Sequence, residues 1–390
     1  MTNTPLKLVY CIPSLHIPGG MERVLTIKAN YFAEVYGYDI SIILTDGEGQ
    51  KTFYELSPKI HIIHLNLNFN QMWDQPFYKK LWIYLKKQRL YKKRLTRCLT
   101  EIQPDITISM LRREINFITS IHDGSIKIGE IHVNKDNFRD FAEEGMSGFI
   151  KKGLAKIWMW QLKQKLKKLS RFVVLTEEDR VKWSGLNNTV VIHNPLPFYP
   201  DQTSDCSKKE VIAVGRYCYQ KGFDLLIEAW RIVAEKYPEW NLRIYGGGEQ
   251  DEYLQLKERY RLTSLYIERQ TQEIVNKYCE SSIFVLSSRF EGFGMVIAEA
   301  MACGLPVVSF ACPCGPRDII HEGKDGFLIK NGNITQMAEK IMYLIEQDDI
   351  RKKMGCRARA GIERFKIENI AGQWKSLFEE IQAAHASGRE

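Results

Sequence analysis

The chain has 390 residues, of which 44% are hydrophobic and 26% charged, with 27 Gly and 13 Pro. This composition suits one large or two ordinary globular domains and excludes collagen-like, low-complexity and disordered chains. The net charge of +8 is uneven, because residues 1–195 carry 29 Lys and Arg against 19 Asp and Glu, whereas residues 196–390 carry 26 against 28. A basic first half indicates an anionic partner there, either a phosphorylated substrate, lipid headgroups or nucleic acid.

The sequence predicts no secretory signal and no bilayer-spanning helix. The first ten residues lack a basic region followed by a long apolar run, and the most apolar window, 295–312, is interrupted by Glu299, Gly304 and Pro306. The nine Cys include no Cys-x-x-Cys pair, which favours reduced thiols over disulfides or a zinc site. We therefore expect a cytoplasmic protein without a metal site.

Short β-branched runs alternate with amphipathic segments of helical length, which predicts the α/β class, with parallel sheets flanked by helices. The expected strands of the first half are 6–12, 39–44, 60–65, 106–110, 126–130 and 171–175. Those of the second half are 210–214, 242–245, 265–267, 283–286, 306–309 and 326–329. Two doubly wound, Rossmann-like domains follow. Ligands gather at the carboxyl ends of such strands, so we expect the site in a cleft where the two domains face each other.

Two features of the first half stand at expected strand ends. Gly19 and Gly20 lie between the first strand and its helix, where a Gly pair allows close approach of the backbone to a ligand, or is ordinary turn chemistry. His132 follows the strand 126–130, where its side chain is expected to face the cleft; a plain structural role is the alternative.

A strongly basic helix is expected over residues 79–97, which contain nine Lys and Arg and no acidic residue. At 100° per residue, seven cations share an arc of about 140°: Lys79, Lys80, Lys86, Lys87, Lys93, Arg94 and Arg97. The adjoining face is apolar and aromatic, so the helix suits an anionic membrane surface or a lipid-linked diphosphate, or is simply solvated. A second basic segment, 151–171, has a Leu and Trp stripe that favours a core-facing helix.

In the second half, the strand 210–214 is followed by a turn with Gly215, Arg216, Lys221 and Gly222. Two cations beside the N-terminal amides of a helix suit a diphosphate, because both neutralise its charge. Solvated surface cations are the alternative. A separate Gly-rich turn, 246–248, follows the strand 242–245 and precedes another helix.

The strongest pattern is the turn Glu291-Gly292-Phe293-Gly294-Met295, which follows a buried strand and opens a helix containing Glu299. The Glu291 carboxylate and the helix-terminal amides can meet one polar ligand. Glu299 lies one to two turns further along, where it can accept hydrogen bonds from another part of an extended ligand. Capping and solvation of the helix is the alternative for the two carboxylates.

With these motifs, the sequence resembles the retaining glycosyltransferases of family 4, which have the GT-B fold and a hallmark of two Glu separated by seven residues. The resemblance implies that Glu291 lies at the donor hexose and that Glu299 binds ribose hydroxyls. It further implies that Arg216 and Lys221 grip the donor diphosphate and that His132 lies near the acceptor. The implied donor-binding turns contain Gly292, Phe293, Gly294, Met295, Gly19, Gly20, Gly246 and Gly248.

The resemblance also implies the reaction: retaining, metal-independent transfer of a hexose or N-acetylhexosamine without an enzymic nucleophile, the leaving diphosphate being stabilised electrostatically. The turn Gly315-Pro316 recurs in members that use UDP-sugars, which makes a UDP-sugar the expected donor. Asp318 stands where the family has Glu, and this leaves its contribution open.

The expected acceptor is a lipid-linked glycan of polysaccharide biosynthesis, such as lipopolysaccharide or capsule. The implied location is the cytoplasmic, inner face of the membrane, and no nucleic acid is expected to bind. Residues 1–195 are the expected acceptor domain, 196–209 the linker and 210–368 the nucleotide-sugar domain, while 369–390 form a helix that packs back on the N-terminal domain. Two alternatives are a non-catalytic protein that binds nucleotide sugar or membrane, and a sugar-nucleotide epimerase, which would need no acceptor.

Overall fold

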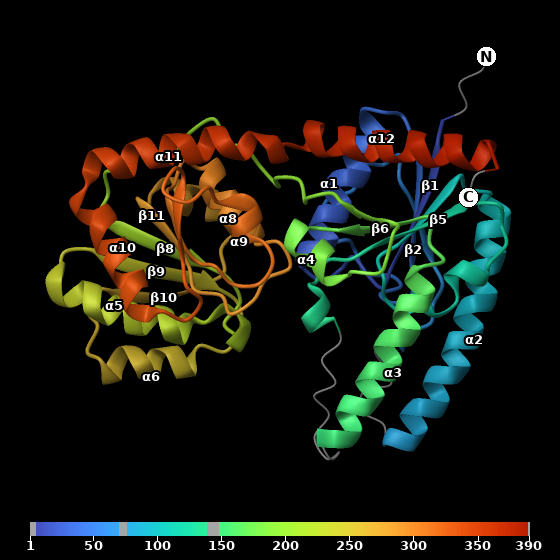
Figure 1. Cartoon of the computed structure of the whole chain (residues 1–390), viewed down its shortest axis with the longest axis horizontal. Helices are drawn as coiled ribbons and strands as arrows, with labels where there is room; N and C mark the ends of the chain where they lie inside the picture. The colour runs from blue at the N-terminus through green and yellow to red at the C-terminus, as the bar shows by residue number, and fades with distance from the viewer. Residues whose placement is uncertain (1–4, 70–75, 139–147, 389–390) are drawn as a thin grey trace. The chain divides into compact units, whose positions relative to one another are not determined.

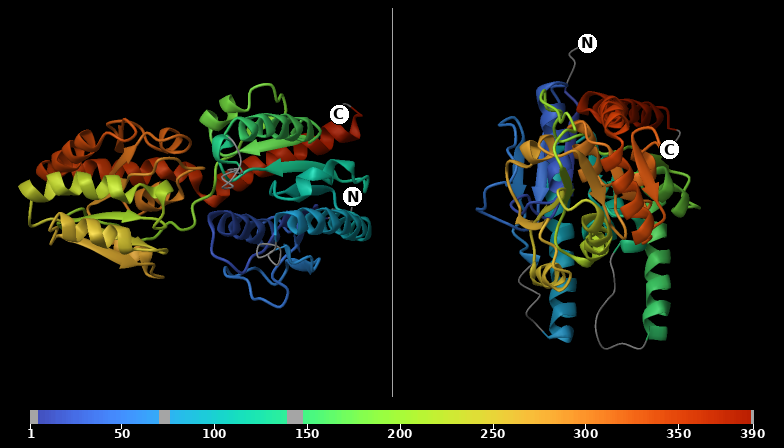
Figure 2. Two further views of the ribbon diagram at one scale, coloured as in Figure 1. Left: turned by 90° about the horizontal axis from the view of Figure 1, so that it is seen from below. Right: turned by 90° about the vertical axis from the view of Figure 1, so that its left-hand side faces the viewer.

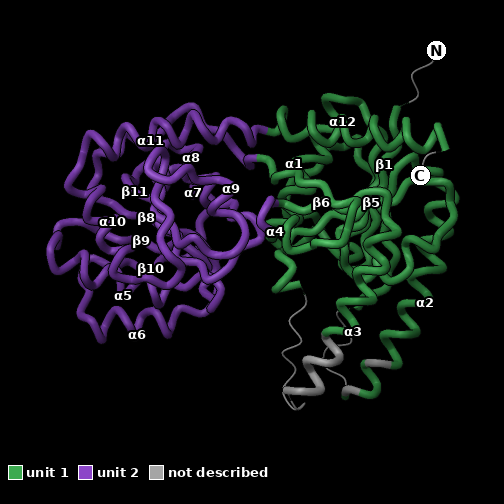
Figure 3. The backbone as a smooth tube through the Cα atoms, in the orientation of Figure 1, with its two compact units in different colours: residues 1–175, 179–195, 367–390 green, residues 176–178, 196–366 purple. Residues whose placement is uncertain are grey.

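The computed structural model describes residues 5–69, 76–138 and 148–388. The chain forms two compact units (Figure 3). Unit 1 comprises residues 1–175, 179–195 and 367–390, and unit 2 comprises residues 176–178 and 196–366. Each unit has its own parallel sheet and its own core, as the alternating sequence pattern predicts.

Unit 1 is built on a seven-stranded sheet in the order β3-β2-β1-β4-β5-β6-β7 (Figure 1). The strands are β1 (Lys7–Ile12), β2 (Asp39–Leu44), β3 (His61–His64), β4 (Ile106–Ser109), β5 (Ile126–Glu130), β6 (Arg171–Val174) and β7 (Thr189–Val191). The helices are α1 (Gly20–Glu34), α2 (Phe77–Ile102), α3 (Gly148–Leu166), α4 (Glu177–Lys182) and α12 (Ile367–Ala386), and the first two residues of α4 belong to unit 2. All the strand pairs are parallel, with Lys7 opposite Asp39 and Ile128 opposite Arg171.

Unit 2 has a six-stranded parallel sheet in the order β10-β9-β8-β11-β12-β13. Its strands are β8 (Glu210–Val214), β9 (Asn241–Gly246), β10 (Leu265–Arg269), β11 (Ile283–Leu286), β12 (Val307–Phe310) and β13 (Gly326–Ile329). Its helices are α5 (Phe223–Lys236), α6 (Asp251–Arg259), α7 (Ile274–Cys279), α8 (Met295–Ala302), α9 (Pro316–Ile319), α10 (Ile334–Glu346) and α11 (Asp348–Ile362).

The twelve predicted strands are confirmed to within one or two residues at each end, and β7 is an additional, unpredicted strand. Because the central strands are buried on both faces, they are continuous apolar runs, which is the pattern that the sequence displays. The apolar window 295–312 forms helix α8, the following turn and strand β12, all within the core of unit 2. Within the described residues, no helix combines the length and apolar character needed to cross a membrane.

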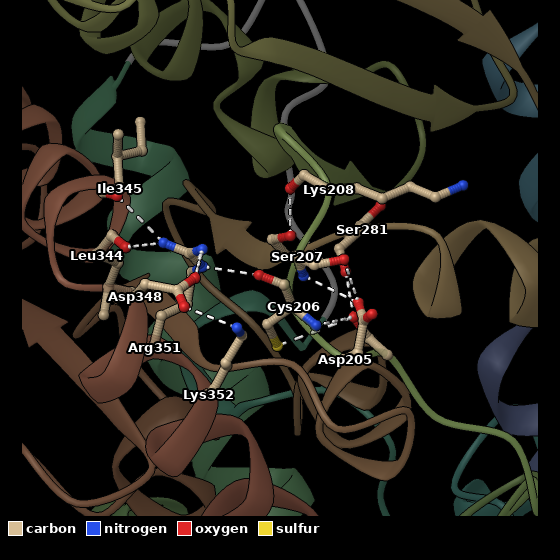
Figure 4. A network of polar contacts seen from close by, with 12 residues as sticks. Asp205, Cys206, Ser207, Lys208, Ser281, Leu344, Ile345, Asp348, Arg351 and Lys352 are labelled. Atoms are coloured by element: carbon tan, nitrogen blue, oxygen red, sulfur yellow. Dashed lines mark hydrogen bonds and ion pairs between the residues drawn. The ribbon is translucent and has the colours of Figure 1, made fainter.

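The segment expected to be a linker, 196–209, packs as part of unit 2. Cys206 is 1% exposed, and its carbonyl accepts a hydrogen bond of 3.0 Å from Nε of buried Arg351 on α11 (Figure 4). The same guanidinium donates to the carbonyls of Leu344 and Ile345 at the end of α10. One arginine therefore ties this segment to the α10–α11 corner.

Helix α12 belongs to unit 1, where it packs against α1 and β5. The rings of Phe378 and Phe32 are 5.9 Å apart, and Trp374 is 1% exposed. These buried aromatic contacts explain why the end of the chain is part of the unit formed by its beginning.

Candidate active site

In unit 2, two strand-to-helix turns lie side by side because β8 and β11 are paired in the sheet. The first turn runs from Gly215 to Gly222 between β8 and α5 and ends in a 3-10 turn, Tyr219–Lys221. The second runs from Ser287 to Gly294 between β11 and α8. Parallel strands place both turns at the carboxyl edge of the sheet, where ligands bind in open α/β folds.

Lys221 and Glu291 meet between these turns. Nζ of Lys221 lies 2.7 Å from Oε1 of Glu291, with the two side chains 13% and 8% exposed. The hydroxyl of Ser288 donates to the same oxygen over 2.6 Å, and the Glu291 amide donates to the carbonyl of Pro313 over 3.0 Å. The Glu291 carboxylate thus lies close to Lys221, the cation predicted from the sequence to bind a diphosphate.

Further contacts hold the two turns together. Arg289 forms an ion pair of 2.5 Å with Asp224 and donates to the carbonyl of Tyr219 over 2.7 Å. The Arg289 amide donates to the carbonyl of Gln220 over 2.8 Å, and Ser287 Oγ donates to the carbonyl of Lys221 over 2.9 Å. These bonds fix Lys221 and Glu291 relative to one another before any ligand arrives, which is the preorganisation that electrostatic catalysis needs.

Arg216 is exposed, and no ion pair involves it in the part of unit 2 that the structure describes. The neighbouring Tyr217 is 6% exposed, and its hydroxyl lies 2.7 and 2.8 Å from the carbonyl oxygens of Ile244 in β9 and Glu268 in β10, to either of which it can donate. At Gly246, a Cβ would lie 1.9 Å from the carbonyl oxygen of Gly215, so only glycine allows this approach of the two turns. Gly248 forms a β-bridge with Tyr217. The Gly-rich turn therefore supports the turn that presents Arg216.

Glu299 is 5% exposed and lies within α8. Its Oε2 accepts a hydrogen bond of 3.2 Å from the hydroxyl of Tyr278, a fully buried residue of α7. Gly294 precedes the helix with a φ of 91°, and no side chain caps the amides of the first helical turn, which starts at Met295. Gly292 and Phe293 complete this turn, with Phe293 buried against Phe365 at 5.4 Å.

The turn after β12 has two features that bear on the site. Burial, and after it the charge of Glu291, raises the pKa of the Cys312 thiol well above its ordinary value. Cys312 is therefore neutral and a poor nucleophile. The Asp318 carboxylate accepts a hydrogen bond of 2.8 Å from the Glu177 amide, and the Glu178 carboxylate accepts one of 3.1 Å from the Cys314 amide. Asp318 thus holds residues 176–178 to unit 2.

In unit 1, Gly19 caps α1 without a side chain, and a Cβ there would lie 2.1 Å from the Glu22 carboxylate. Glu22 is the third residue of the helix, where a carboxylate can interact with the N-terminal amides. Around Gly20 no atom lies within 4 Å of a built Cβ. An anionic ligand at Gly19 and Gly20 therefore has to displace the Glu22 side chain.

His132 lies two residues beyond β5, and its side chain is only 5% exposed. Its Nε2 is 3.0 Å from Oε1 of Glu130, the last residue of β5. The sequence predicted a side chain that faces a cleft, but the His132 ring is almost buried, and its Nε2 edge lies against the carboxylate of Glu130.

The seven cations of α2 do not share one environment. Nζ of Lys87 donates to the carbonyls of Leu67 and Asn68 over 2.6 and 2.5 Å, and Arg94 donates to the carbonyls of Leu65 and Asn66. These two cations hold the segment after β3. Lys80 is half-buried, and the four exposed cations without such bonds among the described residues are Lys79, Lys86, Lys93 and Arg97.

Residues 200–361 match the protein-family model described as glycosyl transferases group 1. A protein of Haemophilus influenzae, described as an uncharacterized glycosyltransferase, is 30% identical over 378 residues, which cover 95% of this chain and 99% of that protein. The chain belongs to the group 1 glycosyltransferases. The poly(ribitol-phosphate) alpha-N-acetylglucosaminyltransferase of Staphylococcus aureus is 31% identical over 270 residues. The alignment covers 66% of the present chain and 51% of the Staphylococcus aureus protein.

Solved structures show the same fold. A crystal structure of Staphylococcus aureus TarM matches with a TM-score of 0.72 and 19% identity, over 96% of this chain and all of that one. Sucrose-phosphate synthase from Thermosynechococcus elongatus matches with a TM-score of 0.76 and 18% identity, over 97% of this chain and all of that one. The glycosyltransferase therefore has the GT-B architecture of two Rossmann-like α/β domains.

Several residues of the candidate site were not predicted from the sequence: Ser288, Arg289, Asp224 and Tyr278. Ser288 and Arg289 stand within the recognised motif, so their position was a usable signal. Asp224 and Tyr278 are distant in sequence from their partners, and only the sheet order brings them close. In the ranges that the structure describes, no three His, Cys, Asp or Glu side chains gather so that they could hold a metal ion.

Proposed function

We propose that this glycosyltransferase moves a hexose or N-acetylhexosamine from a UDP-sugar to a hydroxyl of a polysaccharide precursor, with retention of the anomeric configuration. The observation that carries the proposal is the preorganised group of Lys221, Glu291 and Ser288, with exposed Arg216 on the adjoining turn. A UDP-sugar presents a diphosphate to the two cations and sugar hydroxyls to the carboxylate.

In the proposed reaction, the bond between the sugar C1 and the diphosphate oxygen breaks and a bond from C1 to the acceptor oxygen forms on the same face. The acceptor proton passes to the leaving phosphate oxygen, so no enzymic base or nucleophile is required. Arg216 and Lys221 stabilise the negative charge that grows on the diphosphate, and this electrostatic term supplies most of the rate. Glu299 binds the ribose hydroxyls while Tyr278 holds its carboxylate in place.

Binding of the donor changes the partners of Lys221. Its ammonium is already 2.7 Å from Glu291, so a phosphate that approaches it joins an existing ion pair. The pair fixes the position of the lysine side chain before binding. The Glu291 carboxylate of this pair faces the donor sugar, where it accepts hydrogen bonds from hydroxyls.

Three matched proteins support the donor and acceptor classes. The matched TarM structure contains UDP and alpha-GlcNAc-glycerol, and the Staphylococcus aureus relative is named for transfer of N-acetylglucosamine to poly(ribitol-phosphate). An amylovoran biosynthesis glycosyltransferase of Erwinia amylovora is a further relative. The names of the Staphylococcus aureus and Erwinia amylovora relatives favour a polysaccharide precursor as the acceptor.

We assign the acceptor to unit 1 and propose that it is lipid-linked and reached at the inner face of the cytoplasmic membrane. Helices α2 and α3 extend beyond the sheet of unit 1 in the same direction (Figures 1 and 2). They expose large side chains: Tyr78, Trp82, Leu85, Ile157 and Trp160. Lys79 and Lys86 are exposed beside those of α2, and Lys86 Nζ lies 5.3 Å from the Trp82 ring centre. Exposed aromatic residues among lysines are typical of surfaces that bind anionic lipid bilayers.

The test is release of UDP from a panel of UDP-sugars, with and without a membrane extract that contains lipid-linked glycans. We expect acceptor-dependent release from at least one donor by the wild type and its loss in Glu291→Gln. Asp325→Asn is the matched control, because Asp325 is also buried in unit 2 but pairs with His321 outside the two donor turns. Donor consumption without an acceptor would indicate an epimerase, and UDP binding without turnover a non-catalytic protein; either result contradicts the proposal.

A further inference from the structure

A buried charged network in unit 1 joins α1, the end of β5 and His132. Lys28 of α1 and Glu130 of β5 are each 1% exposed, and Nζ of Lys28 forms an ion pair with Oε1 of Glu130. The same oxygen lies 3.0 Å from Nε2 of His132. A single carboxylate oxygen therefore meets both a lysine ammonium and an imidazole.

Glu130 and Lys28 carry opposite charges that stabilise one another although both side chains are buried. Burial by itself raises the pKa of Glu130, but Lys28 and then His132 outweigh that effect and hold the pKa at about 2. Burial lowers the pKa of Lys28, against the opposing attraction of Glu130. Glu130 is therefore a carboxylate at neutral pH, and a carboxylate can only accept hydrogen bonds.

The state of Glu130 determines which nitrogen of His132 carries hydrogen. An acceptor 3.0 Å from Nε2 favours a hydrogen on that nitrogen, because two lone pairs would repel at this distance. Nε2 is buried and has no well-aligned hydrogen-bond acceptor among the described residues, so Glu130 acts on it through the electrostatic attraction of a carboxylate 3.0 Å away. The other ring nitrogen, Nδ1, is then the one that can meet a ligand.

Helix α12 contributes a third contact to the network through Trp374. The ammonium of Lys28 lies 4.3 Å from the ring centre of Trp374, which is 1% exposed. A cation over an indole face is stabilised by the ring, most strongly where water is excluded. The lysine thus has one carboxylate and one aromatic partner, and it cannot turn away from Glu130 without leaving both.

We propose that Glu130 and Lys28 are positioning residues for His132, which hold its ring in the tautomer with hydrogen on Nε2 and so present Nδ1 to the acceptor hydroxyl. Lys28 acts only through Glu130, and Trp374 acts only through Lys28. The effect on rate rests on the proposed transferase function, whereas the tautomer of His132 does not.

A purely structural ion pair makes a different prediction from a positioning pair. Replacing a buried ion pair by neutral side chains of similar size often costs little stability, whereas removing one partner leaves a buried charge. The double variant Lys28→Met with Glu130→Gln removes both charges together. A structural pair predicts that this variant keeps both its activity and the state of His132, and a positioning pair predicts that it keeps its fold but loses the orientation of the ring.

The test is the long-range 1H–15N NMR spectrum of histidine-labelled full-length protein at mildly alkaline pH, in which His132 is assigned by its absence from His132→Gln. We expect the Nε2–H tautomer in the wild type and a mixture of tautomers in the double variant. The matched control is Glu114→Gln, because Glu114 is equally buried in unit 1 but bonds to Ser109 and to the amide of Arg112. It should leave the His132 signals unchanged.

The kinetic readout complements the spectrum. We expect kcat of the double variant to fall on the order of 10- to 100-fold, the loss seen when the carboxylate that orients a metal-bound histidine is removed, while KM for the donor stays within about threefold. An unchanged His132 spectrum, or a kcat equal to that of the Glu114→Gln control, would overturn the proposal. A changed spectrum in a protein that turns over no UDP-sugar would support the positioning network and refute the proposed function, so the two failures are distinguishable.

Discussion

Gly222 is the position where a single added methyl group tests the geometry of the donor turns. It has a φ of 62°, and a Cβ built on it lies 2.2 Å from the carbonyl oxygen of Ser287, in the turn that carries Glu291. Gly222→Ala therefore combines left-handed strain of about 1–2 kcal/mol with an overpacking cost of about 1–3 kcal/mol. Gly323→Ala is the matched control, since Gly323 has a φ of 71° in the same unit but no atom within 4 Å of its built Cβ.

The free energy of unfolding is measured for both variants in urea. Because the two units can unfold separately, it is followed by hydrogen exchange of peptides from α5 and β11, which report on unit 2 alone. We expect Gly222→Ala to cost about 1–3 kcal/mol more than Gly323→Ala, the overpacking cost alone. We also expect Gly222→Ala to lower UDP-sugar turnover, because relief of the clash with the Ser287 carbonyl displaces the turn that carries Glu291. Equal costs in the two variants, with equal turnover, would refute the close apposition of the donor turns.

Three further predictions concern the remaining features. Arg216→Met should fold like the wild type and lower kcat/KM for the UDP-sugar by roughly 10- to 100-fold in steady-state kinetics, since an exposed cation that contacts a diphosphate contributes charge-assisted hydrogen bonds; an unchanged value would remove it from the site. Replacing both Trp82 and Trp160 by Ser should reduce sedimentation with anionic phospholipid vesicles while leaving turnover of a water-soluble acceptor unchanged, and equal sedimentation would argue against the membrane surface. The pKa of Glu130 is depressed to about 2. The ionised carboxylate therefore stabilises the fold fully above the ordinary Glu pKa of about 4.3, and this stabilisation is lost as the pH falls from there toward 2. Acid unfolding curves should show this loss for the wild type and a smaller loss for the Lys28→Met, Glu130→Gln variant.

The strand and turn pattern could be predicted because it depends on local sequence. Each buried parallel strand is an apolar run, and each site turn carries its glycines and charged residues within a few positions of the strand end. Strand β7 could not be predicted, since it has three half-buried residues at the edge of the sheet. The tie between Arg289 and Asp224 depends on the pairing of β8 with β11, which no local pattern reveals.

The helices of unit 1 show a second limit. The core-facing stripe that periodicity predicted for 151–171 is confirmed at Leu162, Leu166 and Leu169, whereas the burial of Tyr91 and Leu95 on α2 was not predicted. Periodicity could not show where a helix extends beyond the edge of the sheet, so the exposure of Trp160 was not predicted. Nor could it show that Lys87 holds a segment after β3, because a lysine bonded to carbonyl groups and a solvated lysine have the same sequence signature.

The central claim is that the turns carrying Arg216, Lys221 and Glu291 perform a retaining sugar transfer from a UDP-sugar. The most direct measurement is the anomeric configuration of the glycosidic bond in the isolated product, determined by 1H NMR for the wild type and for Glu291→Gln. The account predicts that the wild type forms a product with the configuration of the donor and that the variant forms little or none. An inverted configuration, or equal product from the variant, would contradict it.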